Sequence, residues 1–204
     1  MAHVVVMGAG IAGMPAAYDL KKALPQHEIT LIGSSTHFQF TPSNPWVAVG
    51  WREPQQVQVA VGPNVQKQGI RFTPQPVVHI DAGSNSLELA DGQKLQYDYL
   101  VIATGPRLAF DEIPGLGPDG YSHSICTTPH AENAGKAYNE FLKDPGPVVV
   151  GAVQGASCFG PAYEFAMILD ADLRKRKLRD RVPITFVTSE PYIGHMGLGG
   201  VGDS

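Results

Sequence analysis

A glycine fingerprint between a short apolar strand and a helix is the feature that most constrains the fold of this chain. Residues 3–7 (His-Val-Val-Val-Met) predict a buried strand, and Gly8, Gly10 and Gly13 follow it in Gly-x-Gly-x-x-Gly spacing. In this motif the first glycine permits a tight turn, the second lets the backbone approach a pyrophosphate, and the third lets the helix pack closely on the strand. A returning strand over 28–32 completes the unit. The pattern predicts a dinucleotide-binding βαβ unit.

The position that should bind the ribose departs from the usual fingerprint. An acidic residue is expected there, about 20 residues after the glycines, but the chain has a Gly-Ser-Ser-Thr run at 33–36. A serine hydroxyl makes the same hydrogen bond more weakly, so we assign this contact to Ser34.

A second signature indicates which dinucleotide binds. A buried strand predicted over 97–102 runs into Ala103, Thr104 and Gly105. Ala-Thr-Gly at the end of such a strand resembles the second signature of FAD domains in flavoproteins that have two dinucleotide domains. A β-rich insertion, expected between the halves of such a domain, is predicted between residues 70 and 89. We therefore predict FAD, and not NAD, as the cofactor.

A second strand-to-helix turn, over residues 151–160, carries Cys158. The helix beyond it has apolar residues at helical spacing, at Ala162, Phe165, Ala166, Leu169 and Leu173. The Gly151-x-x-x-Gly155 spacing is not that of the fingerprint, so we predict no NADH site there. At a helix N-terminus, unpaired N–H groups and the positive end of the helix dipole favour a thiolate, which predicts a nucleophile. The alternative is a small buried residue that packs the helix on the strand.

Four further segments carry a family resemblance: the runs 43–51 (SNPWVAVGW), 124–127 (SICT), 155–164 (GASCFGPAYE) and 189–195 (SEPYIGH). Together with the fingerprints they resemble the bacterial sulfide:quinone oxidoreductase family, in the flavoprotein disulfide reductase superfamily. The resemblance covers the whole chain. It implies FAD-dependent oxidation of sulfide to sulfur or polysulfide with electron transfer to quinone, so sulfide and quinone are the implied partners.

The resemblance also implies the catalytic residues. In that family Cys158 and a third cysteine in the carboxyl half form the redox pair beside the flavin, and Cys126 assists. This chain has two cysteines, so the pair cannot form here as the family forms it. His130 and His195 could exchange protons near neutral pH, and Glu164 is a candidate proton acceptor on the helix after the cysteine. For each of these three the alternative is a solvated surface residue.

The predicted flavin-binding residues are Gly8, Gly10, Gly13, Ser34, Pro42, Asn44, Val77, Ala103, Thr104 and Gly105. We expect Trp46 and Trp51, with Phe38 and Phe40, to fill the core of the flavin domain. The two cysteines lack Cys-x-x-Cys spacing, so no metal site is predicted.

The predicted fold class is α/β: a Rossmann-like FAD-binding βαβ domain with a β-rich insertion, followed by a partial second Rossmann-like domain. We place the first domain at 1–110, and a linker with the partial second domain, which carries the redox cysteine, at 111–204. Chains of the resembled family are longer and end in amphipathic helices that dock on a membrane surface. We expect these 204 residues to be part of a longer polypeptide, inactive alone, with a second chain covering the open strand edges.

Charge and hydropathy limit the partners and the location. The net charge of −4 argues against nucleic acid, and the basic cluster over 174–181 favours a solvated helix end over a lipid or phosphate patch. No segment approaches the ~18 consecutive apolar residues of a membrane span. The fingerprint strand begins at residue 3, which leaves no room for a cleaved signal peptide. We expect a peripheral membrane protein that is made in the cytoplasm.

Two other functions are compatible with these features. One is an NADH-dependent flavoprotein oxidoreductase of the NADH:quinone type, and the other is a non-catalytic flavin-binding module. Sulfide should bleach the flavin of a sulfide:quinone oxidoreductase, NADH should bleach that of the second class, and neither should affect the third.

Overall fold

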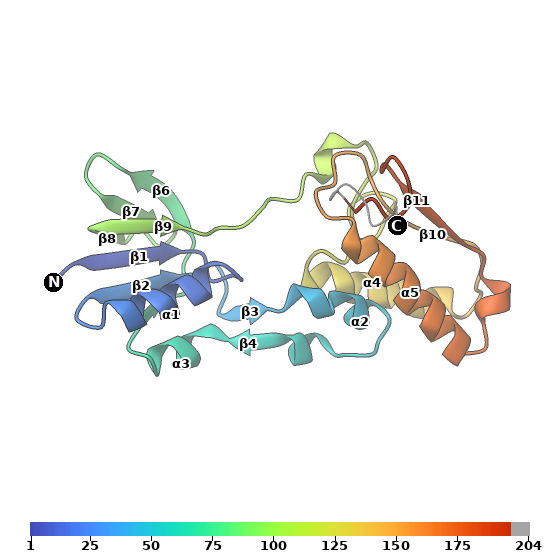
Figure 1. The fold of residues 1–204 in the computed structure, drawn as a ribbon, viewed down its shortest axis with the longest axis horizontal. Helices are drawn as coiled ribbons and strands as arrows, with labels where there is room; N and C mark the ends of the chain where they lie inside the picture. The colour runs from blue at the N-terminus through green and yellow to red at the C-terminus, as the bar shows by residue number, and fades with distance from the viewer. Residues whose placement is uncertain (197–204) are drawn as a thin grey trace. The chain divides into compact units, whose positions relative to one another are not determined.

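The computed structural model describes residues 1–196, which divide into two compact units (Figure 1). The first unit contains residues 1–39 and 58–109, and the second contains 40–57 and the described residues from 110 onward. The chain enters the second unit, returns to the first and then leaves it again. Residues 40–57 thus belong to the second unit, although they lie inside the predicted first domain.

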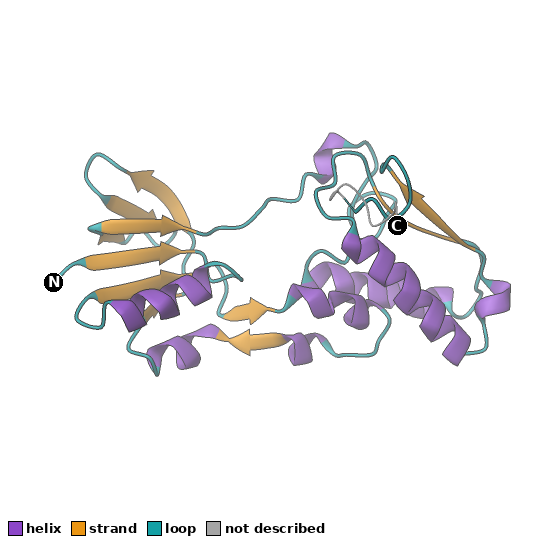
Figure 2. Ribbon diagram, viewed as in Figure 1, coloured by secondary structure: helices purple, strands orange, loops and turns teal. Residues whose placement is uncertain are grey.

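The first unit is built on a parallel sheet (Figure 2). Its elements are β1 (His3–Met7), α1 (Gly13–Ala23), β2 (Glu28–Ile32), β3 (His37–Gln39), β4 (Gln58–Ala60), α3 (Val61–Gln66), β5 (Arg71–Thr73), β6 (Val77–Asp81), β7 (Ser86–Leu89), β8 (Lys94–Gln96) and β9 (Tyr99–Ile102). The four-stranded parallel sheet has the order β5-β2-β1-β9, and β6, β7 and β8 form a three-stranded antiparallel sheet. β3 and β4 form a separate antiparallel pair.

The parallel sheet is covered on both faces. Val4 and Val6 of β1 pack with residues of α1 and α3, whereas Val5 packs with Leu87 and Leu89 of β7. Successive residues of a strand point to opposite faces, so a strand buried on both faces becomes a continuous apolar run. Burying each such valine stabilises the fold by roughly 1.5–3 kcal/mol.

The place of β5 corrects one prediction. The sequence predicts a β-rich insertion that begins at residue 70, but β5 pairs in parallel with β2, with Phe72 opposite Leu31. β5 is therefore an edge strand of the parallel sheet, and the insertion consists of β6, β7 and β8. The residues of a short apolar strand do not reveal which sheet the strand joins.

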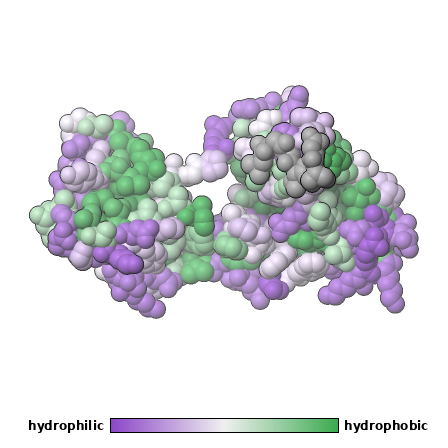
Figure 3. All heavy atoms as spheres, viewed as in Figure 1, coloured by the Kyte–Doolittle hydropathy of each residue, from purple (hydrophilic) through white to green (hydrophobic). Residues whose placement is uncertain are grey.

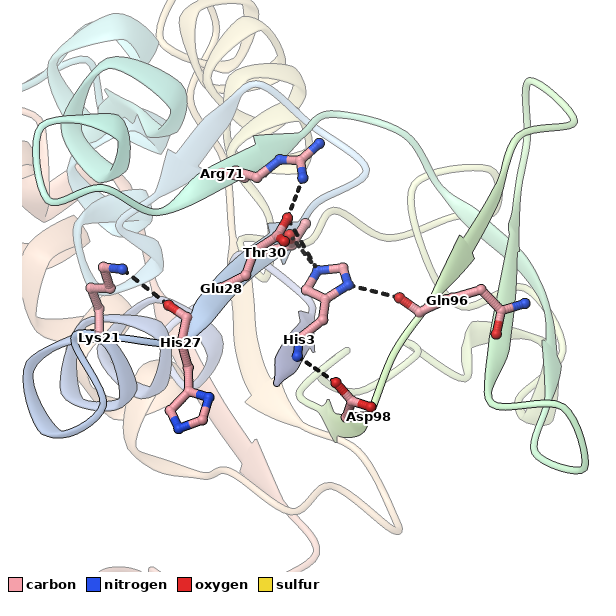
Figure 4. A network of polar contacts seen from close by, with 8 residues as sticks. All are labelled: His3, Lys21, His27, Glu28, Thr30, Arg71, Gln96 and Asp98. Atoms are coloured by element: carbon pink, nitrogen blue, oxygen red, sulfur yellow. Dashed lines mark hydrogen bonds and ion pairs between the residues drawn. The ribbon is translucent and has the colours of Figure 1, made fainter. Parts of the chain in front are cut away.

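A polar network ties together the amino ends of the parallel strands (Figure 4). The backbone N–H of His3 donates to Asp98 at 2.6 Å, and the ring Nε2 of His3 lies 2.8 Å from the hydroxyl of Thr30. Glu28 is ion-paired with Arg71. These contacts join β1, β2, β5 and the residue before β9. The carboxyl ends of these strands lie at the opposite end of the sheet, and it is there that open parallel sheets bind ligands.

The second unit packs helices against a parallel strand pair. Its elements are η1 (Thr41–Ser43), α2 (Asn44–Ala48), η2 (Pro54–Val57), η3 (Phe110–Glu112), α4 (Thr128–Phe141), β10 (Val148–Ala152), α5 (Gly160–Lys175), η4 (Arg179–Arg181) and β11 (Ile184–Thr188), where η denotes a 3-10 helix. β10 and β11 pair in parallel. Within residues 1–196, no helix is both long and apolar enough to cross a membrane.

The main core of the second unit lies between α5 and the strand pair. Leu169 and Leu173 of α5 pack with Val150 of β10, as the helical spacing of these apolar residues predicts. A second contact joins α2 to α4, where the helices approach closely because Gly135 has no side chain. A Cβ at Gly135 would lie 3.2 Å from the carbonyl oxygen of Val47.

A buried carboxylate, Asp172 of α5, joins three parts of the second unit. It is 1% exposed and accepts hydrogen bonds from Trp51 Nε1 at 2.8 Å, the Tyr138 hydroxyl at 2.7 Å and Arg176 Nε at 2.6 Å. Burial raises the pKa of Asp172, but the three hydrogen bonds outweigh burial and hold the pKa below its ordinary value. The prediction that Trp46, Trp51 and Phe40 fill the core of the flavin domain is wrong, because all three belong to the second unit. Phe38 does pack against the core of the first unit.

Candidate functional site

A pocket in the first unit opens at the carboxyl ends of the parallel strands. The turn after β1 (residues 8–12), the residues after β2 (33–35) and those after β9 (103–105) line it, together with residues 37–39 and 75–80. Its volume is about 720 Å³, which is within the range of cofactor sites. This edge of the sheet is where the glycine fingerprint predicts a dinucleotide.

Three glycines allow the turn between β1 and α1 to form. Gly8 has a φ of +116°, and a Cβ there would lie 2.1 Å from the carbonyl oxygen of Ala103. A Cβ at Gly13 would lie 1.7 Å from the carbonyl oxygen of Gly8. Gly10 differs, because nothing lies within 4 Å of the place where its Cβ would be. Gly8 and Gly13 are therefore required for packing, whereas Gly10 leaves open space at the pocket wall.

The open space at Gly10 and the uncapped start of α1 fit a pyrophosphate group. The N-cap residue of α1, Ala12, has no side-chain acceptor, and the first turn carries no acidic residue. Unpaired N–H groups at a helix N-terminus bind phosphate oxygens. The residues present therefore fit the diphosphate of FAD, with Ser34 on the pocket wall after β2.

The structure brings most of the predicted flavin-binding residues to this pocket. Those that line it are Gly8, Gly10, Ser34, Val77, Ala103, Thr104 and Gly105. Gly13 supports the turn without lining the pocket, and Pro42 and Asn44 lie in the second unit. Ser35 and His37 also line the pocket, although the sequence analysis did not assign them. Their place just beyond the carboxyl end of β2 is the signal that could have identified them.

Both cysteines are free and exposed, and each lies one residue before a helix N-cap. Cys126 precedes Thr127, whose side chain caps α4 by accepting a hydrogen bond from the backbone N–H of His130 at 3.2 Å. Cys158 precedes Phe159, which has no side-chain acceptor to cap α5. The alternative of a small buried packing residue is therefore wrong for Cys158, and the first N–H groups of α5 have no side-chain cap.

Two buried polar atoms at the start of α2 and α4 lack a hydrogen-bond partner among the described residues. They are Nδ2 of Asn44 and Nδ1 of His130. Asn44 is fully buried, and its Oδ1 accepts a hydrogen bond from the hydroxyl of Thr128 at 3.1 Å. The ring of His130 lies 5.7 Å from that of Phe110, between centroids. Since buried polar groups are almost always paired, each of these atoms offers an open hydrogen-bonding position to water, a ligand or a further part of the protein.

The loop after β11 holds a third group of polar side chains. Glu190 accepts hydrogen bonds from the hydroxyl of Tyr163 at 2.6 Å and from that of Thr188 at 2.7 Å. Burial raises the pKa of Glu190, but these hydrogen bonds and the nearby charge of His195 outweigh burial and hold the pKa below its ordinary value. Glu164, the predicted proton acceptor, is exposed on α5. Sequence reasoning missed Glu190, although its place just beyond the carboxyl end of a parallel strand was a signal for it.

The family model for pyridine nucleotide-disulphide oxidoreductases matches residues 2–176 of this chain. The chain belongs to this family. Its members are FAD-binding flavoproteins with a Rossmann-type fold, so the predictions of an α/β fold and of FAD as the cofactor are confirmed.

The relatives identify a subgroup within the family. The sulfide-quinone reductase of Aquifex aeolicus is 47% identical over 202 residues, which are 99% of this chain and 46% of that protein. The crystal structure of the sulfide:quinone oxidoreductase from Aquifex aeolicus matches with a TM-score of 0.92 and 46% identity, again over 99% of this chain and 46% of that chain. NDH2 from Plasmodium falciparum matches with a TM-score of 0.72 over 91% of this chain and 41% of that chain, but its 17% identity shows the fold alone. The resemblance to sulfide:quinone oxidoreductases is thereby confirmed, and the chain spans about half the length of the relatives that it matches.

Proposed function

We propose that this chain forms the flavin-binding and sulfur-binding part of a sulfide:quinone oxidoreductase. The 47% identity to the sulfide-quinone reductase of Aquifex aeolicus carries the proposal, because it extends over 99% of the chain and so over both units. Two features of the chain support it: a pocket that fits the diphosphate of FAD, and the exposed Cys158 before α5.

The proposed reaction removes an electron pair from sulfide, which becomes zero-valent sulfur, and delivers the pair to a quinone. Bound FAD supplies the acceptor for that pair. Cys158 would hold the sulfur as a persulfide: its thiolate and HS⁻ form an S–S bond as they give up the electron pair to the bound acceptor and HS⁻ loses its proton. Cys126 would relay this sulfur. Quinone reduction also takes up protons, and His130, His195 and Glu164 are the groups to which we assign proton exchange.

We also propose that a further polypeptide segment or a second chain covers the strand pair of the second unit. Val149 of β10 and Val187 of β11 are 70% and 52% exposed. Parallel strands are normally buried on both faces, and a two-stranded sheet is marginally stable alone. We further propose that the enzyme associates peripherally with a membrane, because quinones dissolve in the lipid phase. Residues 1–110 and 111–204 remain our proposal for the domain limits.

Anaerobic titration of the purified full-length flavoprotein tests this function, because we expect the 204 residues alone to be inactive. Sulfide should reduce the flavin and bleach its visible absorbance, and a soluble quinone analogue should then restore the absorbance. NADH should leave the spectrum unchanged. Bleaching by NADH but not by sulfide would indicate an NADH-dependent oxidoreductase instead, and bleaching by neither would indicate a flavin-binding module.

Paired cysteine variants test the assigned roles. Cys158→Ser should abolish bleaching by sulfide while the flavin stays bound, because the nucleophile is lost and the pocket is intact. Cys126→Ser should slow bleaching without abolishing it. Bleaching of Cys158→Ser at the rate of the unaltered protein would contradict the role of this cysteine.

A further inference from the structure

A cavity in the second unit is lined by basic side chains from two separate elements. Arg52 comes from the loop after α2, and Lys175 and Arg176 come from the end of α5. Among the described residues, Asp172 is the only acidic residue that lines this cavity. The lining therefore carries three positive charges against one negative charge.

Arg52 is held in place by aromatic and backbone contacts. Its guanidinium carbon lies 5.2 Å from the centre of the Trp46 ring, and its Nη1 donates to the carbonyl oxygen of Trp51 at 2.9 Å. The loop turns at Gly50, which has a φ of +74° that favours glycine. Because these contacts fix the guanidinium in advance, binding an anion costs less side-chain entropy.

Arg176 is held by the buried carboxylate. Its Nε donates to Oδ2 of Asp172 at 2.6 Å, and 41% of its side chain is exposed. Trp51 and Tyr138 also donate to this carboxylate, so the only negative charge of the lining is already engaged. In the described part of the chain, the ammonium group of Lys175 makes no hydrogen bond or ion pair, so its N–H groups are available to a ligand.

The polarity of α5 explains only part of this arrangement. Basic residues in the last turn of a helix are stabilised by the negative end of the helix dipole, which accounts for Arg174 and Lys175. Arg52 lies on a different element, and its presence at the same cavity adds repulsion between like charges. Hydrophilic residues gather over this end of α5 (Figure 3), in a chain whose net charge is −4. A bound anion would offset the local repulsion.

We propose that this cavity binds a phosphate-like oxyanion, with Arg52, Lys175 and Arg176 as its donors. Guanidinium groups suit phosphate because two N–H groups can donate in parallel to two oxygens. Inorganic phosphate and the headgroup of phosphatidylglycerol present the same chemistry. The sequence favoured a solvated helix end for the basic cluster over 174–181, and the contribution of Arg52 from a separate element is the observation that changes this interpretation.

Tryptophan fluorescence reports on this cavity alone, because the chain has two tryptophans and both contact it or its arginine. Trp51 lines the cavity, and Trp46 lies under Arg52. We would titrate the 204-residue chain with inorganic phosphate, and in parallel with vesicles of phosphatidylglycerol and of phosphatidylcholine. A saturable change with phosphate identifies a soluble ligand, and a change with phosphatidylglycerol vesicles alone identifies a lipid headgroup. The proposal would be overturned if no titration gave a saturable change. It would also be overturned if phosphate had no effect and the two kinds of vesicle gave equal responses.

Matched variants test whether the lining residues bind the anion, with calorimetry as the second readout. Arg52→Gln and Lys175→Gln should each weaken binding about tenfold, because each removes a charge-assisted hydrogen bond. Lys175→Arg should retain binding. Lys143→Gln removes the same charge from a side chain that is 70% exposed and outside the cavity lining, so it should leave affinity unchanged. If Lys143→Gln weakened binding equally, the effect would come from the overall charge of the protein, and the proposed site would be wrong.

Discussion

The two strand-turn-helix segments of this chain differ in how tightly the turn between strand and helix is packed. In the first, the turn over residues 8–12 is so compact that a Cβ at Gly13 would lie 1.7 Å from the carbonyl oxygen of Gly8. In the second, the loop over 153–159 separates β10 from α5, and Gly155 has a φ of +74° with nothing within 4 Å of where its Cβ would be. The strand glycine of the second segment is close-packed too, since a Cβ at Gly151 would lie 2.0 Å from the carbonyl oxygen of Val187. The difference therefore lies in the residues after the strand: Gly13 is tightly packed, whereas Gly155 is surrounded by open space.

This difference shows that glycine spacing predicts what a turn can do. Gly-x-Gly-x-x-Gly places glycines where two backbones touch, so the N–H groups of α1 face a phosphate across a rigid turn. The Gly-x-x-x-Gly spacing gives a longer loop that exposes Cys158 before an uncapped helix. The first segment suits cofactor binding, and the second suits thiol chemistry.

The largest expected effect tests the closed turn. Gly13→Val should destabilise the first unit by more than about 4 kcal/mol, because the new side chain collides with backbone that cannot move away. Soluble yield and thermal melting by circular dichroism measure this. A folded Gly13→Val protein with an unchanged melting temperature would remove the distinction between the two turns.

The second unit has a smaller sheet, so we expect it to depend on its buried carboxylate. Asp172→Asn should destabilise this unit by about 3–5 kcal/mol, because an ionised partner of Arg176 is lost from a buried site. The folded pKa of Asp172 lies below the ordinary value of 3.8, so its stabilisation is complete above that value and is lost as the pH falls through the folded pKa. Urea denaturation at a series of pH values from 7 to 2 measures the cost of the substitution and its dependence on pH. The loss of stability on acidification should be smaller in Asp172→Asn than in the unaltered protein.

The third prediction separates folding from cofactor binding within the closed turn. Gly10→Val should weaken FAD binding at least about 100-fold, because the side chain enters the space left for the pyrophosphate. The fold should stay intact, since nothing lies within 4 Å of the new Cβ. Absorbance of the purified protein and its melting temperature without flavin check the two halves of this prediction. Stoichiometric flavin in Gly10→Val would show that the pocket is assigned wrongly.

The open loop should tolerate substitution. Gly155→Ala should cost about 1 kcal/mol, because alanine is strained at this positive φ but meets no neighbouring atom. Denaturant midpoints measure the cost. A loss as large as that of Gly13→Val would mean that the second turn is as closed as the first.

The smallest expected effect compares the two cysteines. Both are exposed, but Thr127 caps the helix after Cys126, whereas the helix after Cys158 has no side-chain cap. Cys158 should react with iodoacetamide near neutral pH about two to five times faster than Cys126, the range expected from a helix N-terminus. Mass spectrometry of peptides from a time course measures both rates in one sample. Equal rates would show that the N-terminus of α5 does not increase the reactivity of Cys158.

Local patterns in the sequence were sufficient to predict much of the fold. The Val-Val-Val run of β1, the glycine fingerprint and the apolar spacing of α5 each act within a few residues, and each element forms where the pattern indicates. The pocket of the first unit also lies where the same patterns predict a site, because the carboxyl ends of parallel strands lie side by side.

Contacts between residues far apart in the sequence could not be predicted from local patterns. Nothing in the run 43–51 indicates that it packs with α4 in the second unit, and nothing near Asp172 indicates that Trp51 donates to it from 121 residues away in sequence. The hydrogen bond of Tyr163 to Glu190 likewise depends on how α5 lies against the loop after β11. Such contacts form only when elements distant in sequence pack together, so periodicity and spacing cannot predict them.

The path of the chain between its two units also sets an order of events during synthesis. β1 pairs with β9, and Met7 lies opposite residue 102. The parallel sheet is therefore incomplete until residue 102 has left the ribosome. By then the segment over 40–57 has already emerged, and its apolar Val47 and Ala48 lack the partners that α4 later supplies, Ala131 and Ala134. Neither unit is a continuous stretch of the gene. No single cut in the coding sequence can release either unit intact, and the nascent chain must keep α2 from misfolding while both units assemble.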